Sequence, residues 1–126
     1  MPTVKVNDIN VYYEIVGQGE PLVIIAGLGF EISGMVEHQN PDISTRYRTV
    51  FIDNRGVGRT DKPDKPYTLE MMAEDVVGVM DTLGIKRAHL LGISMGSRIA
   101  LALAVTHPER VNGLVLWVAA PAYRQG

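Results

Sequence analysis

Four short apolar runs, separated by stretches with helical spacing, constrain most strongly what this chain can fold into. The runs lie at residues 21–27, 49–54, 88–93 and 113–120. Continuous apolar runs that end at glycine or polar residues are typical of strands buried on both faces of a parallel sheet. Strands that alternate with helices form right-handed βαβ units, in which helices cover the sheet faces. The pattern therefore predicts an α/β fold with four parallel strands.

The intervening segments carry helical signals. In 69–83, apolar residues recur at spacings of three and four, and Thr68 and Gly84 can cap the two ends. A second helix is predicted from residue 94 to residue 107, and a short or broken helix within 33–47, which contains Gly34 and Pro41.

Two β-rich runs at the start of the chain flank Asn7 and Asp8, residue types that tolerate a positive φ in tight turns. These runs predict an N-terminal antiparallel hairpin. Together, the segments predict a single mostly parallel sheet, made of this hairpin and four parallel strands, with helices on both faces.

Composition excludes several classes of function. The chain has no cysteine, which excludes disulfides, thiolate catalysis and cysteine-based zinc sites. A net charge of −2 gives no reason to expect nucleic acid or an acidic membrane surface as a partner. The apolar runs are too short for a membrane span and the start lacks a signal-peptide core, so we expect a cytoplasmic single domain without a membrane partner.

One serine lies at a predicted strand-to-helix junction. Gly92, Ser94 and Gly96 fit the pattern G-x-S-x-G, in which small residues let a sharp turn expose the serine oxygen. The backbone N–H of Met95 would then point at an oxyanion that forms on the attacked carbonyl. The pattern predicts a nucleophile elbow, and the alternative is a serine that only caps the following helix.

A glycine-rich loop follows the first apolar run. Gly27 lets the backbone approach a ligand, and the N–H of Leu28 is the expected second oxyanion donor. A plain strand-to-helix loop is the alternative. A dinucleotide loop is disfavoured, because Ile32 occupies the position of the third glycine of G-x-G-x-x-G.

These motifs together resemble the α/β-hydrolase superfamily. The segment 53–60 is similar to the family's D-x-R-G-x-G-x-S, with Thr60 where serine is usual, and 107–111 resembles the common end of the helix after the elbow. Segment 61–76 is similar to 3-oxoadipate enol-lactonases and related carboxylesterases. The resemblance covers the N-terminal half of the family fold. The chain departs from many members at Ala26, where they have histidine, but backbone donors survive that change.

The resemblance implies a serine hydrolase that acts on small carboxylic esters or lactones through an acyl-enzyme on Ser94, with no metal or organic cofactor. It assigns structural roles to the loop residues of the D-x-R-G-x-G motif. The alternative is that its two charged members form a catalytic pair. The motif residues are Asp53, Arg55, Gly56 and Gly58.

A serine needs a general base, and an acid to orient that base. His107 and Glu109 lie beyond a helix that starts at the serine, about 20 Å away. His89 precedes Ser94 by five strand residues, about 16 Å. His38 follows the oxyanion loop and stays open as a base, although it has no obvious acid partner.

We therefore expect the catalytic acid and histidine to come from outside residues 1–126, which would form one incomplete core domain that ends at the expected cap-domain junction. The last apolar run would then be an exposed sheet edge at residues 114–118, and such edges recruit partners. The alternative function is a truncated or split hydrolase with little activity alone. It would pair with a missing C-terminal half or form a homo-oligomer through this edge.

Overall fold

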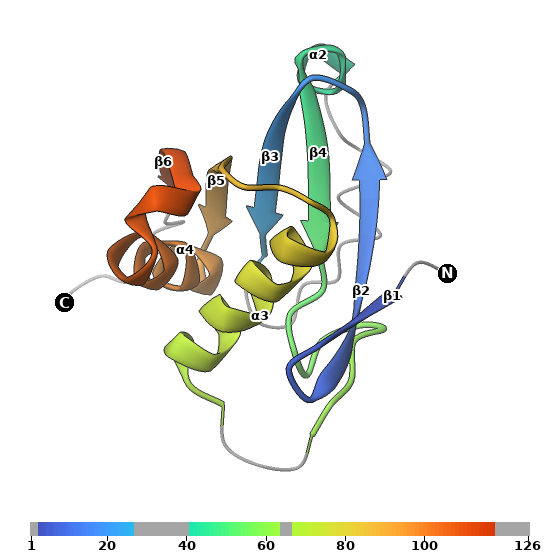
Figure 1. Cartoon of the computed structure of the whole chain (residues 1–126), viewed down its shortest axis with the longest axis vertical. Coiled ribbons are helices and arrows are strands. Elements are labelled where there is room, and N and C mark those ends of the chain that lie inside the picture. The colour runs from blue at the N-terminus through green and yellow to red at the C-terminus, as the bar shows by residue number, and fades with distance from the viewer. Residues whose placement is uncertain (1–2, 27–40, 64–66, 118–126) are drawn as a thin grey trace, which may run out of the picture.

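The computed structural model describes residues 3–26, 41–63 and 67–117, which form one sheet with helices packed on it (Figure 1). In chain order, the elements are β1 (Thr3–Val6), β2 (Ile9–Val16), β3 (Glu20–Ile25), α2 (Pro41–Arg46), β4 (Tyr47–Ile52), α3 (Leu69–Thr82), β5 (Ala88–Ile93), α4 (Met95–Thr106), the 3₁₀ turn η1 (Pro108–Arg110) and β6 (Val111–Trp117).

The sheet has six strands in the order β1-β2-β4-β3-β5-β6. The hairpin strand β2 pairs antiparallel with β1 and with β4. The strands β3, β4, β5 and β6 run parallel to one another. Asn7 lies in the hairpin turn with φ 52°. The predicted fold class, an antiparallel hairpin joined to four parallel strands, is confirmed.

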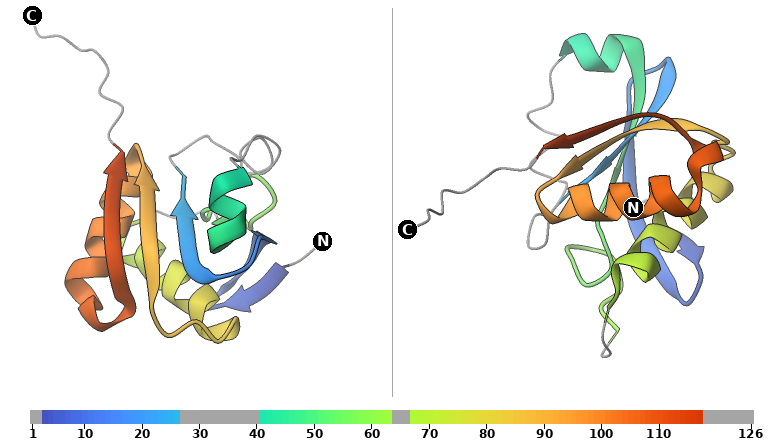
Figure 2. Two further views of the ribbon diagram at one scale, coloured as in Figure 1. Left: turned by 90° about the horizontal axis from the view of Figure 1, so that it is seen from above. Right: turned by 90° about the vertical axis from the view of Figure 1, so that its left-hand side faces the viewer.

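Helices lie on both faces of this sheet, as predicted. Figure 2 shows α2 on one side and α3 and α4 on the other. The α3 and α4 side holds the larger apolar core, in which Val76, Met80 and Leu103 are fully buried. A smaller cluster on the α2 side contains Tyr12 and Phe51. Because both faces are buried at the centre, the central strands read as unbroken apolar runs.

Local signals placed two elements closely. β5 has the predicted bounds, and α3 begins at the predicted residue and ends one residue early. The Thr68 hydroxyl accepts a hydrogen bond from the Met71 N–H at 3.0 Å, and Gly84 has a φ of 73° just beyond the helix. Both cap predictions are confirmed.

Other boundaries differ from the prediction. Strand β4 begins at Tyr47 rather than at residue 49, because Tyr47 and Arg48 pair with the first two residues of β3. Strand β6 likewise begins at Val111, which pairs with Ala88. Pairing across the sheet thus extends strands into polar residues that the apolar pattern had excluded.

The predicted helix within 33–47 is only partly described. Its described part is α2, a short helix of six residues that begins at Pro41, and the rest of the predicted segment lies outside the described residues. Proline suits the first turn of a helix, because its missing N–H would lack an intrahelical acceptor in any case. In the part of the chain that the structure describes, no helix has the length and apolar character needed to cross a membrane.

Candidate active site

Ser94 lies between the last residue of β5 and the first residue of α4, and its side chain is exposed. Its backbone has φ 57° and ψ −121°, a conformation that costs a residue with a Cβ about 1–3 kcal/mol. Hydrogen bonds hold it there: the Ser94 N–H donates to the carbonyl of Trp117 in β6 at 2.8 Å, and the Ser94 carbonyl accepts the Ser97 N–H at 2.9 Å. A strained, exposed serine is therefore fixed between a buried strand and a helix.

The two flanking glycines pack against backbone with no space for a side chain. A Cβ at Gly92 would lie 2.5 Å from the carbonyl oxygen of Gly96 and 2.6 Å from the Cα of Ser97. A Cβ at Gly96 would clash with the carbonyl oxygen of Ile25 at the end of β3. Glycine at both positions lets the first turn of α4 lie directly on β3 and β5.

Of the two expected oxyanion donors, the structure describes Met95 but not Leu28. Met95 is the first residue of α4, so its N–H has no acceptor within the helix and lies at the positive end of the helix dipole. Gly27 and Leu28, which carry the second expected donor, lie outside the described residues. The residue just before them, Ala26, follows β3 and is buried.

Asn54 contacts this part of the backbone, and the sequence analysis did not single it out. Its Nδ2 donates to the carbonyl of Ala26 at 2.7 Å, and the residue is 4% exposed. The amide therefore joins the end of β3 to the loop after β4. The available signal in the sequence was a polar residue directly after an apolar run, between Asp53 and Arg55.

The loop after β4 closes on itself through Asp53 and Thr60. The Asp53 carboxylate accepts the Arg59 N–H at 3.2 Å, and a Cβ at Gly58, which has φ 55°, would clash with that carboxylate. The Thr60 hydroxyl donates to the Asp53 carbonyl at 2.6 Å and accepts the Tyr12 N–H at 2.9 Å. The Thr60 hydroxyl thus links the Asp53 carbonyl to the backbone of β2.

Arg55 is 1% exposed and joins three separate segments. Its Nε and Nη2 donate to the two carboxylate oxygens of Asp75 in α3 at 2.8 and 2.9 Å, and Nη2 also reaches Asp8 of the hairpin turn at 2.9 Å. Hydrogen bonds to Asp75, opposed by burial and supported by Asp8, raise the pKa of Arg55 above its usual value. Next to it, a Cβ at Gly56 would lie 2.6 Å from the Tyr67 ring.

Two histidines pair with carboxylates far from Ser94. His89 Nε2 lies 2.9 Å from Glu20 Oε1, and His107 Nε2 lies 2.6 Å from Glu74 Oε2. His38 lies outside the described residues. Among residues 3–26, 41–63 and 67–117, no three His, Asp or Glu side chains gather as a metal site requires.

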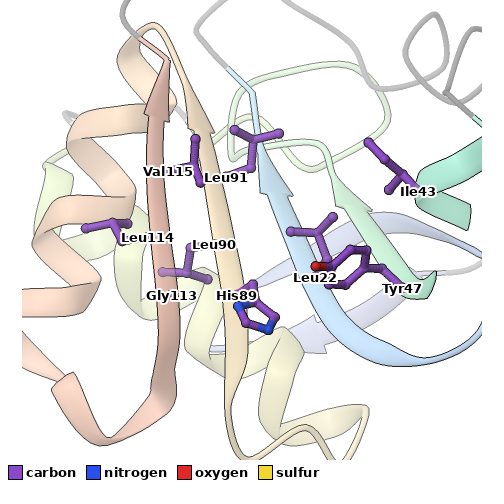
Figure 3. A pocket seen from close by; sticks show the side chains of 9 residues that line it. All are labelled: Leu22, Ile43, Tyr47, His89, Leu90, Leu91, Gly113, Leu114 and Val115. Carbon is purple, nitrogen blue, oxygen red and sulfur yellow. The ribbon is translucent and has the colours of Figure 1, made fainter.

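A hollow of about 270 Å³ opens on the α2 side of the sheet (Figure 3). Its walls come from β3, β4, β5, β6 and α2, and His89 and Tyr47 are the residues in it with polar side-chain atoms. Ser94 is not among the lining residues. The hollow therefore lies on the sheet face, and the residues that line it do not include the elbow serine.

Comparison with known proteins places this arrangement in a family. Residues 20–125 match the family model described as the alpha/beta hydrolase fold. A 2-hydroxy-6-oxononadienedioate/2-hydroxy-6-oxononatrienedioate hydrolase of Burkholderia vietnamiensis is 40% identical over 114 residues, which cover 86% of this chain and 40% of that protein.

Solved structures agree with this match. The enol-lactonase of Burkholderia xenovorans LB400 superposes with a TM-score of 0.85 at 35% identity, covering 90% of this chain and 45% of that one. Est816, described as an N-acyl homoserine lactone degrading enzyme, gives 0.84 at 34% identity, covering 91% and 44%. The chain spans less than half the length of these relatives. It belongs to the alpha/beta hydrolase fold family, whose members named here are hydrolases.

Proposed function

We propose that this chain is the nucleophile-bearing part of a serine hydrolase that acts on small carboxylic esters or lactones. Ser94 Oγ attacks the carbonyl carbon and loses its proton to a general base. The C–O bond to the alcohol breaks, the alcohol leaves with that proton, and an acyl-enzyme remains. Water then releases the acid and restores the serine.

The observation that carries this proposal is the backbone of Ser94. A positive φ at a residue with a Cβ persists only where the surroundings enforce it, and such strain gathers at functional sites. Here it turns an exposed hydroxyl outward directly before the N-terminus of α4. A helix-capping serine would bond its side chain to the first turn, but the Ser94 side chain makes no such capping hydrogen bond.

The substrate class rests on the relatives. One structural neighbour is named an enol-lactonase and another an N-acyl homoserine lactone degrading enzyme. A lactone is a cyclic ester, so attack by serine opens the ring and the leaving alcohol stays on the acyl group. Oxyanion donors would be the N–H groups of Met95 and Leu28.

The base and the acid are proposed to come from a further polypeptide segment. Within the described residues, His89 and His107 are bound to Glu20 and Glu74. Their positions along β5 and α4 place them about 16 and 20 Å from Ser94. A hydroxyl without a base within hydrogen-bond reach is a weak nucleophile near neutral pH.

A fluorophosphonate probe tests this proposal. The chain alone is compared with the chain fused to the C-terminal part of the Burkholderia xenovorans enol-lactonase, and mass spectrometry locates the label. We expect rapid labelling of Ser94 in the fusion, slow labelling in the chain alone, and none in Ser94→Ala. A folded fusion that labels elsewhere, or not at all, would contradict the proposal.

A second proposal concerns the behaviour of this chain alone: it pairs through the edge of the sheet at β6. The side chains of Val115 and Trp117 are each 60% exposed and that of Leu116 is 40% exposed, so apolar groups face outward on both sides of an edge strand. Across α4, Leu101 and Val105 are also exposed, 47% and 73%. Such an edge offers unpaired backbone groups and apolar area to another strand.

The occupant is a polypeptide strand, from a C-terminal half or from a second copy. Sedimentation analysis tests this pairing. We expect the chain to self-associate. Val115→Lys should weaken this association, because it places a charge in the interface. Thr106→Lys, at an exposed helix position, should leave the association unchanged. A monodisperse wild-type monomer that also fails to bind a C-terminal half would refute pairing.

A further inference from the structure

The carbonyl of Ser94 is held by both donors of one residue. Ser97, which is 7% exposed, donates its main-chain N–H to that oxygen at 2.9 Å and its hydroxyl at 2.5 Å. Neither bond involves the Ser94 side chain. Ser97 therefore controls the orientation of the peptide unit that follows the proposed nucleophile.

That peptide unit contains the N–H of Met95. The carbonyl of Ser94 and the N–H of Met95 belong to one planar trans peptide, so they point in opposite directions from the same rigid plate. The plate can turn through ψ of Ser94, which is −121°, and φ of Met95. Two hydrogen bonds at the oxygen end restrict this turning and so help to fix the direction of the N–H end.

Ser97 is itself held in place by close backbone packing. Its Cα would lie 2.6 Å from a Cβ added at Gly92, so the first turn of α4 rests directly on β5. Gly96, the preceding residue, rests in the same way on the end of β3. The backbone that carries the Ser97 hydroxyl is thus packed closely on the sheet.

We propose that the Ser97 hydroxyl is a positioning residue that aims the Met95 N–H at the oxyanion formed on the carbonyl that Ser94 attacks. The inference deepens the proposed function and rests on it. Ser97 touches the carbonyl of Ser94 and not the substrate, so its effect passes through the peptide plane. When the hydroxyl is removed, only the hydrogen bond from the Ser97 N–H remains, and the peptide unit between Ser94 and Met95 can rotate more freely.

A purely local role is the competing explanation. Serine and threonine often bond to carbonyls three or four residues earlier in a helix, with a small effect on helix stability alone. The same helix contains an example: the Thr106 hydroxyl donates to the carbonyl of Ala102 at 2.8 Å. Thr106→Ala removes a bond of the same kind at the far end of α4 and is the matched control.

The direct test measures the direction of the Met95 N–H in the full chain, by residual dipolar couplings of ¹⁵N-labelled protein. We expect Ser97→Ala to shift the Met95 coupling while the couplings of the α4 interior still fit the wild-type orientation. Ser97→Thr keeps a hydroxyl and restores the coupling, and Thr106→Ala leaves it unchanged. Ser97→Cys, with a weak donor of similar size, serves if the alanine variant does not fold.

The second measurement is the phosphonylation rate of Ser94 in the fusion that carries a base. Complete loss of one oxyanion donor costs a factor of roughly 10²–10³, so a misaimed donor should slow the reaction by about 10-fold in Ser97→Ala, with rescue by threonine. A Met95 coupling that shifts in neither the alanine nor the cysteine variant would overturn the inference. If Ser94 stays inert in every variant, the proposed function fails instead, while the couplings still decide the role of Ser97.

Discussion

Replacing Arg55 with methionine should remove a large part of the stability of this domain. The buried guanidinium makes two hydrogen bonds to Asp75 and one to Asp8, all within 2.9 Å. Methionine keeps most of the aliphatic volume and none of the charge. Asp75, which is 3% exposed, would keep the 3.1 Å hydrogen bond from Asn7 Nδ2 but would lose the positive charge of the Arg55 guanidinium.

The magnitude follows from the asymmetry of buried pairs. Removing one partner leaves an uncompensated charge out of water, which costs about 3–5 kcal/mol. A domain of this size is stable by about 5–15 kcal/mol, so the variant loses roughly a fifth or more of that. At about 4 °C per kcal/mol for 126 residues, the melting temperature should fall by roughly 12–20 °C.

Two further variants separate the unpaired charge from the lost packing. Arg55→Met combined with Asp75→Leu removes both charges and should recover much of the loss, because no buried carboxylate is left unpaired. Asp81→Asn breaks an ion pair in which Arg110 Nη2 lies 2.7 Å from Asp81 Oδ1. The side chain of Asp81 is 61% exposed. The substitution should cost less than about 1 kcal/mol.

Urea unfolding followed by far-UV circular dichroism, at several protein concentrations, measures these differences. The ordering expected is Asp81→Asn closest to wild type, then the double variant, then Arg55→Met. The reasoning is refuted if Arg55→Met unfolds within 1 kcal/mol of wild type, or if the double variant is less stable than the single one.

Three other changes test the elbow and the loops. Gly96→Ala should destabilise the chain by more than Gly84→Ala in urea unfolding, because a Cβ at position 96 clashes with backbone. A Cβ at position 84 meets open space, so that variant carries only the cost of a φ of 73°, roughly 1–2 kcal/mol. Equal losses would contradict the packing described. The hydrogen bond to Glu14, followed by burial, raises the pKa of Tyr12, so its stabilising contribution is complete below the unfolded value of about 10 and is lost as pH rises through the folded pKa. Unfolding free energies measured from pH 9 to 12 should therefore fall less steeply in Tyr12→Phe than in wild type, and parallel curves would refute this. Asn54→Leu leaves the carbonyl at the end of β3 without its side-chain donor and should cost about 1–3 kcal/mol by the same unfolding assay, whereas no loss would show that the bond is dispensable.

The sequence alone determined the elements and their kind. Strand β5 has its predicted bounds, α3 its predicted caps, and Ser94 its predicted place at the junction of strand and helix. These features are readable because apolar periodicity, cap chemistry and glycine spacing act over a few residues. The sequence pattern marks where glycines flank the serine, although the clash that excludes a side chain at Gly96 comes from the distant strand β3.

Tertiary structure alone decided which residues meet. Arg55 belongs to a recognisable motif, yet its partners come from 20 residues later and 47 residues earlier, and no local pattern pairs them. The bond from Asn54 to Ala26 also depends on β4 lying next to β3 in register. Ser97 and Ser94 are only three residues apart, yet the two hydrogen bonds from Ser97 to the Ser94 carbonyl also depend on tertiary structure. They form where Ser94 has a positive φ and the first turn of α4 packs against β3 and β5. Strand order, register and close backbone contact are set by the whole sheet, so the geometry around the proposed nucleophile became visible only in the folded chain.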